Sequence, residues 1–142
     1  MTNEATMHEG GCLCGAIRYR ATAEPTALVL CHCSTCRKAA GAPSLAWAVF
    51  PAQSFAFTQG QPAIYRSSET VQRSFCANCG TSLGYWSSSR PDVMDVTTAS
   101  LDEPDQYAPQ KEIWLDEKIA WQCADPDRPR YPRTSKSSQP LP

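Results

Sequence analysis

The sequence predicts a mainly β domain held together by metal ions, and three observations support this prediction. Short segments of apolar and alternating residues recur along the chain between turn residues, a pattern typical of antiparallel strands. Twelve prolines and a scarcity of long helical patterns argue against a helical fold. Seven of the eight cysteines fall into three tight groups, and such spacing indicates metal ligation.

The expected elements follow one another in short steps along the chain. In the first strand, Ile17 and Tyr19 share one face, while Arg18 and Arg20 share the other. A strand that contains Phe55 and Phe57 turns near Gly60. The first strand covers residues 16–20. The other expected strands are residues 27–31, 45–50, 63–67, 70–75, 82–86 and 93–99.

One short helix is expected at residues 35–40, between Ser34 as N-cap and Gly41 just after its end. Residues 112–121 fit either a helix or a strand. The length of 142 residues suits one domain, which we place at residues 10–124. Residues 1–9 resemble a loose lead-in. Residues 125–142 hold five of the twelve prolines and are expected to form a disordered or surface-clinging tail.

Charge and hydropathy exclude several classes of partner. The net charge of −1 gives no attraction to nucleic acid or to an anionic membrane surface. No apolar run approaches the ~18 residues that a membrane span needs, and residues 1–11 lack the pattern of a secretory signal. We therefore expect a cytoplasmic protein with reduced thiols, in which metal ligation is a better use of eight cysteines than disulfides.

Two cysteine pairs have the spacing of a structural zinc site. Cys12 and Cys14 lie two residues apart, so on an extended strand both sulfurs point to the same face. Cys76 and Cys79 have the CxxC spacing of a zinc knuckle, with Gly80 directly after them. Four thiolates close a tetrahedral site, and joining the pairs would staple the first strand to the middle of the chain.

The third group, Cys31, Cys33 and Cys36, supplies three thiolates and would leave one coordination position open. The expected helix places Cys36 in its first turn, where free backbone N–H groups favour the thiolate form. Two other arrangements stay open on spacing alone. Cys33 and Cys36 could join Cys76 and Cys79 as a zinc ribbon, or could form a redox-active pair.

Neighbouring residues have two interpretations each. His32 is either a ligand or a side chain that points away from the metal, and strand alternation favours the second. Arg37 and Lys38 could balance thiolate charge or bind a ligand's carboxylate, or they could lie on a solvated helix face. Cys123 stands alone and is interpreted as a free thiol or a small apolar residue.

Three stretches of the chain resemble a known family: residues 11–19 (GCLCGAIRY), 31–37 (CHCSTCR) and 73–81 (RSFCANCGT). In this order, and over about residues 10–121, they are similar to the glutathione-dependent formaldehyde-activating enzyme family, also called the centromere protein V type. The resemblance implies a β-tent fold and two zinc ions. It implies structural zinc at Cys12, Cys14, Cys76 and Cys79, and catalytic zinc at Cys31, Cys33 and Cys36.

The activity that the resemblance implies is condensation of glutathione with formaldehyde to S-hydroxymethylglutathione, a carbon–sulfur lyase reaction written in reverse. The open zinc position would take the thiolate of glutathione or a similar small thiol. One departure is visible, because Glu112-Ile113-Trp114 stands where the family often has a His-Ile pair before an aromatic residue. The alternative function is a non-catalytic zinc module that binds a protein partner.

Overall fold

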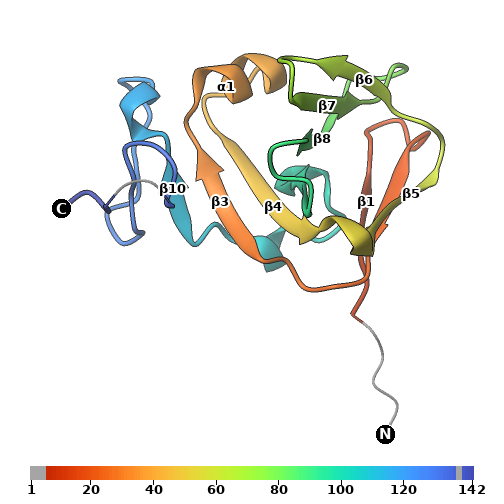
Figure 1. The fold of residues 1–142 in the computed structure, drawn as a ribbon, viewed down its shortest axis with the longest axis horizontal. Helices are drawn as coiled ribbons and strands as arrows, with labels where there is room; N and C mark the ends of the chain where they lie inside the picture. Colours follow the sequence, from red (N-terminus) through yellow and green to blue (C-terminus); the bar gives the residue numbers. More distant parts are fainter. Residues whose placement is uncertain (1–5, 137–138) are drawn as a thin grey trace, which may run out of the picture.

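Two β-sheets form the body of the protein in the computed structural model, which describes residues 6–136 and 139–142 (Figure 1). The small sheet has the strand order β1-β2-β5, and the large sheet has the order β10-β3-β4-β9-β8-β7-β6. The strands are β1 (His8–Gly11), β2 (Arg18–Ala21), β3 (Ala27–Cys31), β4 (Leu45–Pro51), β5 (Phe55–Gln59), β6 (Ala63–Arg66), β7 (Val71–Phe75), β8 (Ser82–Ser87), β9 (Val93–Thr97) and β10 (Lys111–Ile113).

The prediction of a mainly β, antiparallel fold is confirmed, and each of the eight expected segments contains a strand. One strand, β1, was missed, because its sequence HEGG shows no alternation of apolar residues. Residues 112–121, which fit either a helix or a strand, begin with the end of the three-residue strand β10 and continue into the 3-10 helix η4 (Leu115–Glu117). β10 also departs from the antiparallel pattern, because it pairs in parallel with β3. Residues 98–99, expected at the end of a strand, instead begin the 3-10 helix η2 (Thr98–Ser100).

The main core lies between the two sheets. Tyr19 of the small sheet packs with Phe50, Leu83 and Val96 of the large sheet, and each of these side chains is almost completely buried. A second, smaller cluster contains Val29, Cys31, Cys36 and Trp47. Alternation along β3 and β4 explains this division, because successive side chains of a strand point to opposite faces. Cys12 and Cys76 belong to the main core, whereas Cys31 and Cys36 belong to the smaller cluster.

The helix α1 (Ser34–Ala40) confirms the expected helix, with one correction at its start. Its N-cap is Cys33 rather than Ser34, because the Cys33 sulfur accepts the hydrogen bond from the Cys36 backbone N–H. Ser34 instead donates to the Glu117 carboxylate of the 3-10 helix η4 (Leu115–Glu117). Gly41 ends the helix with φ of 64°, as expected. Within residues 6–136 and 139–142, no helix is long and apolar enough to cross a membrane.

The segments on either side of the expected domain also contact the sheets. His8 and Glu9 belong to β1, although we expected residues 1–9 to be a lead-in, and residues 1–5 lie outside the described part. The described part of the tail runs beside β10, where the Glu112 backbone N–H donates to Pro129 and its carbonyl accepts from Tyr131. The domain bounds themselves stay a prediction.

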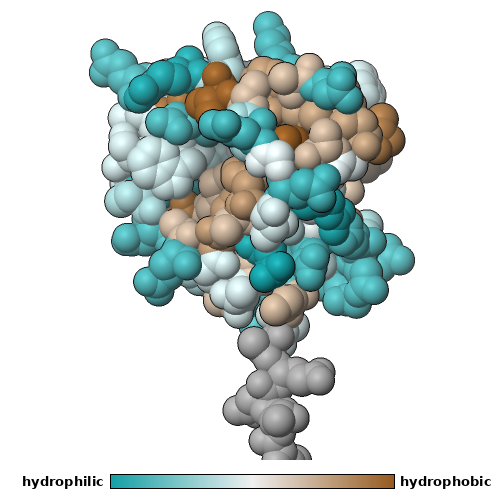
Figure 2. Space-filling model, turned by 90° about the vertical axis from the view of Figure 1, so that its right-hand side faces the viewer, coloured by the Kyte–Doolittle hydropathy of each residue, from teal (hydrophilic) through white to brown (hydrophobic). Residues whose placement is uncertain are grey.

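An apolar hollow lies where the two sheets face each other near β5 and β6. It is a cavity of about 330 Å³ with Phe55, Phe57, Ile64, Trp86 and Met94 in its wall. Figure 2, which views the molecule from the side of β5, shows apolar surface on this face. Arg73 and Ser74 are neighbours on β7, so their side chains leave opposite faces of that strand. Ser74 lines the hollow, whereas Arg73 reaches Cys36 of α1.

Candidate metal centres

The first candidate centre joins the two sheets at a pair of tight turns. Cys12 and Cys14 lie in the turn between β1 and β2, and Cys76 and Cys79 lie in the turn between β7 and β8. All four sulfurs lie within 4.8 Å of one another. Each turn contains a glycine with positive φ, 80° at Gly15 and 82° at Gly80. We name this set the four-cysteine group.

Short contacts hold these sulfurs in place. The Cys12 sulfur accepts from the Ile17 backbone N–H at 3.2 Å, and the Cys76 sulfur accepts from the Cys79 N–H at 3.5 Å. The Asn78 amide donates to the Cys14 sulfur at 3.2 Å. A hydrogen bond with the Thr81 hydroxyl is the main cause that lowers the pKa of Cys79 to about 5. The Thr81 hydroxyl thus favours the thiolate form of Cys79, which is the form that binds metal.

The spacing of the sulfurs fits a tetrahedral zinc ion. Zinc–sulfur bonds of about 2.3 Å in a tetrahedron place the sulfurs about 3.8 Å apart. The distance between the Cys12 and Cys14 sulfurs is 3.6 Å, and that between Cys14 and Cys76 is 3.8 Å. Four thiolates at this spacing match a closed structural zinc site, so the residues fit the ion that the sequence predicts.

The second candidate centre lies at the end of β3 and the start of α1. Cys31 is the last residue of β3, Cys33 is the N-cap of α1, and Cys36 lies in the first turn of the helix. Their sulfurs also lie within 4.8 Å of one another. We name this set the three-cysteine group. Cys31 and Cys36 are buried, while Cys33 is half-buried and its sulfur contacts the Thr35 hydroxyl at 2.9 Å.

The three thiols share hydrogen bonds among themselves. Donation from Cys31, and next from Cys36, lowers the pKa of Cys33 well below its usual range. The pKa of Cys31 is raised, mainly because Cys31 donates to Cys33. The pKa of Cys36 is also raised: its contact with Cys31 lowers it, but the contact with Cys33 and burial outweigh that effect. Of the three sulfurs, that of Cys33 therefore has the surroundings that most favour a thiolate.

Arg73 is a site residue that sequence reasoning missed. Its guanidinium lies 3.9 Å from the Cys36 sulfur and 3.4 Å from the Thr35 hydroxyl, although it comes from β7. Within the described residues, Arg73 donates to the Cys36 sulfur, whereas the role considered for Arg37 and Lys38 stays a prediction. The only available signal was its place in the stretch before Cys76, which does not show where the side chain points.

Aromatic side chains surround the three-cysteine group. Trp47, Tyr85 and Trp114 all belong to or pack against the cluster that contains Cys31 and Cys36. The Trp47 and Tyr85 rings meet edge to face, with centroids 5.9 Å apart. Trp114 has φ of 61°, a left-handed conformation that is uncommon for a bulky residue. Strain of this kind is concentrated at functional sites, where the surrounding structure maintains it.

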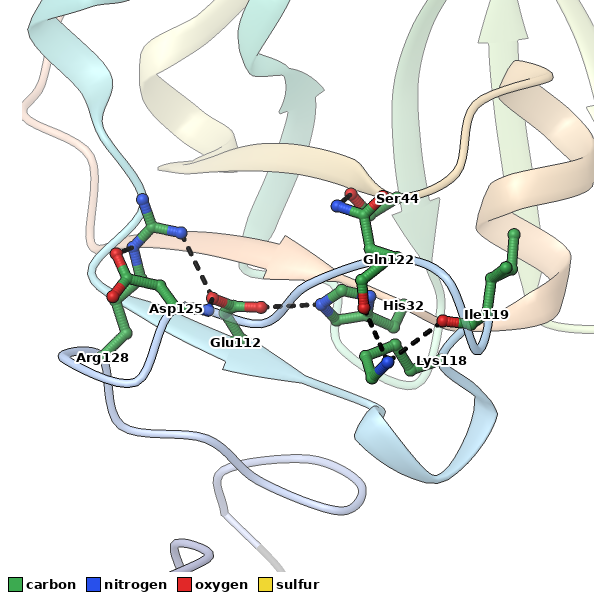
Figure 3. A network of polar contacts seen from close by, with 8 residues as sticks. All are labelled: His32, Ser44, Glu112, Lys118, Ile119, Gln122, Asp125 and Arg128. Carbon is green, nitrogen blue, oxygen red and sulfur yellow. Dashed lines mark hydrogen bonds and ion pairs between the residues drawn. The ribbon is translucent and has the colours of Figure 1, made fainter.

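His32 points away from the sulfurs, as strand alternation predicts. Its Nε2 lies 2.8 Å from a Glu112 carboxylate oxygen, and both side chains are fully buried. The second Glu112 oxygen accepts from the Asp125 backbone N–H and from Arg128. Figure 3 shows this network between β3 and the C-terminal segment. Glu112, the departure noted in the sequence, therefore stabilises the segment of residues 31–33 through its contact with His32.

The structure divides the seven cysteines into the four-cysteine and three-cysteine groups. It does not bring together the ribbon set that mixes Cys33 and Cys36 with Cys76 and Cys79, since these two pairs lie in different groups. Cys123 is exposed and belongs to neither group. A mainly β domain with two cysteine clusters of metal-binding geometry defines the class of protein: a small cysteine-rich domain with two candidate metal centres.

The chain belongs to the glutathione-dependent formaldehyde-activating enzyme family, whose model matches residues 7–117. A protein from Schizosaccharomyces pombe, named an uncharacterized lyase, is 39% identical over 84 residues, which cover 54% of this chain and 55% of that protein. A protein from Halomonas elongata, named a putative glutathione-dependent formaldehyde-activating enzyme, is 26% identical over 80% of this chain and 78% of its own.

A solved structure supports the same fold. The crystal structure of a Rhodobacter sphaeroides protein is similar to this chain with a TM-score of 0.56 and 25% identity. The likeness covers 66% of this chain and 87% of the other. The family and these relatives agree with the fold predicted from the sequence.

Proposed function

We propose that this protein is a zinc-dependent enzyme of the carbon–sulfur lyase type that acts on the adduct of a small thiol and a small aldehyde. The specific reaction is the condensation of glutathione with formaldehyde to S-hydroxymethylglutathione, or its reverse. Family membership and the names of the relatives support the class of reaction. The observation that carries the proposal is the three-cysteine group, which is separate from a complete set of four thiolates.

The two cysteine groups would have different tasks. Cys12, Cys14, Cys76 and Cys79 would hold a structural zinc that joins the small sheet to the large one. Cys31, Cys33 and Cys36 would hold the second zinc. When bound, that ion would supply a Lewis acid that lowers the pKa of a thiol bound to it.

The chain's own residues would prepare this position. The α1 N-terminus and the hydrogen bonds at Cys33 favour thiolate ligands, and Arg73 supplies a positive charge beside Cys36. Trp47 and Tyr85 reduce the access of water on one side. The thiol sulfur forms a bond to the aldehyde carbon, and the thiol proton ends on the aldehyde oxygen, so no other co-reactant is needed. We also propose a reducing, cytoplasmic location, because the ligands must stay free thiols.

A titration tests the proposal. Zinc-loaded protein is titrated with glutathione in a calorimeter, and formaldehyde is then added. We expect saturable thiol binding in the wild type and in Cys123→Ser, and its loss in Cys33→Ser. The formaldehyde step should yield S-hydroxymethylglutathione, detected by NMR. If protein that carries both metals binds no small thiol, the enzyme assignment is wrong and the partner-binding zinc module becomes the better function.

A further inference from the structure

Arg73 is a buried cation without a carboxylate partner in the ion pairs of the described residues. Its relative exposure is 9%, and arginine is rarely buried to this extent unless it is paired. Its hydrogen-bond acceptors are the hydroxyls of Ser67 and Thr35 and the Cys36 sulfur. A neutral hydroxyl does not compensate a buried positive charge. Full compensation therefore requires negative charge at the three-cysteine group.

The side chain is held firmly in this position. Arg73 lies directly opposite Tyr85 in the pairing of β7 with β8, and its guanidinium carbon stands 5.0 Å from the centre of the Tyr85 ring. A guanidinium over an aromatic face is attracted by the ring, more strongly where water is excluded. The Tyr85 ring in turn packs against Trp47. The charge is thus fixed beside Cys36 before any ligand arrives.

Charge counting shows what this cation changes. A divalent ion with three thiolates has a net charge of 2 − 3 = −1, and a fourth anionic ligand makes it −2. Such a step is opposed by repulsion, which a fixed positive charge a few ångströms away reduces. A neutral ligand leaves the net charge at −1 and gains far less from Arg73. The group thus discriminates between ligands by their charge.

We propose that Arg73 is a specificity-determining residue that makes the three-cysteine group select an anionic ligand, a thiolate above all, over a neutral one. The inference rests on the proposed function for the identity of the thiol, but not for the preference for anions. The ligand preference distinguishes this role from that of a purely structural arginine, whose loss would affect stability and leave the preference unchanged.

The test uses protein loaded with Co²⁺, whose absorption bands report changes at the metal. Three ligands are titrated: 2-mercaptoethanol as a thiol, azide as an anion without sulfur, and imidazole as a neutral ligand. The variants are Arg73→Gln, which removes the charge, and Arg73→Lys, which retains it. Arg66→Gln is the matched control, because Arg66 is exposed on the neighbouring strand β6 and its loss changes the net charge equally.

We expect Arg73→Gln to weaken binding of azide and thiol at least about tenfold, with imidazole affinity changed less than about threefold. Arg66→Gln should bind all three like the wild type. If Arg73→Gln does not fold, Arg73→Lys decides, and it should keep the preference for azide over imidazole. Equal weakening of all three ligands, or none, would overturn the inference. Wild-type protein that binds azide but no thiol would support the anion preference and contradict the proposed function instead.

Discussion

His32 and Glu112 form a hydrogen bond of 2.8 Å between two side chains with no exposure to solvent. His32 lies between two cysteines of the three-cysteine group, whereas Glu112 lies on β10, whose backbone pairs with the C-terminal segment. The second Glu112 oxygen accepts from the Asp125 N–H at 2.8 Å and from Arg128 at 3.3 Å (Figure 3). One carboxylate therefore ties the cysteine loop to residues near the chain's end.

Replacement of this carboxylate should be strongly destabilising. Glu112→Ala leaves His32 Nε2 and the Asp125 N–H without their acceptor, while Arg128 keeps its ion pair with Asp125. Loss of one partner of a buried charged pair costs about 3–5 kcal/mol. Chemical denaturation should show this loss of unfolding free energy. The control is Glu69→Ala, since Glu69 is exposed, and it should change stability by less than about 0.5 kcal/mol. Similar stability of both variants would show that the network contributes little.

Alkaline pH should destabilise the fold through Tyr19. Burial is the main cause that raises the pKa of Tyr19, while its hydrogen bond to Ser100, at 2.7 Å, acts in the opposite direction. Above about pH 10 the unfolded chain loses this proton and the folded chain keeps it. The unfolded state then binds fewer protons, so the free energy of unfolding falls, by up to about 1.4 kcal/mol per pH unit.

Denaturation at a series of pH values from 8 to 11 measures this slope. Tyr19→Phe should be less stable than the wild type at pH 8, because it lacks the hydrogen bond to Ser100, and its stability should fall less steeply above pH 10. Tyr65→Phe, at an exposed position, is the control and should keep the wild-type slope. An unchanged slope in Tyr19→Phe would exclude Tyr19 as the source of the pH dependence.

Substitution of two glycines that have similar φ angles should distinguish the cost of backbone strain from the cost of a steric clash. Gly41 and Gly60 have φ of 64° and 71°, but a Cβ at Gly41 meets open space, whereas one at Gly60 would lie 2.3 Å from the Ala16 carbonyl oxygen. Gly41→Ala should cost about 1 kcal/mol from strain alone. Gly60→Ala should cost at least about 2 kcal/mol more, because the turn between β5 and β6 must move away from Ala16, just before β2. Thermal unfolding measures both, and equal losses would contradict the close approach.

The sequence predicted most of the sheet structure and the grouping of the cysteines. Strands such as β3 and β8 carry local apolar patterns, and the spacing of Cys31, Cys33 and Cys36 is itself local. β1 could not be predicted in this way, because a strand of the sequence HEGG is specified by its pairing with β2. Gly10 in it is required by the close approach of Tyr19 and of the Ser100 carbonyl.

Arg73 and Glu112 could not be assigned for a different reason. The position of Arg73 depends on the register of β7 against β8 and on the packing of α1, contacts between residues 37 positions apart. Glu112 meets His32 across 80 positions through a parallel strand pair. No periodicity within a short window of sequence contains such information.

The two cysteine groups should respond differently to loss of one ligand. Cys76→Ser removes a thiolate from the group that joins the small sheet to the large one, and a structural zinc site contributes directly to the free energy of folding. This variant should not fold stably. Cys36→Ser should leave a folded protein that loses the second metal, falling from about two equivalents of zinc to about one. Elemental analysis and circular dichroism of both variants provide the measurement, with Cys123→Ser as control. If both variants unfold alike, the three-cysteine group also holds the fold together, and its assignment as an open site would be wrong.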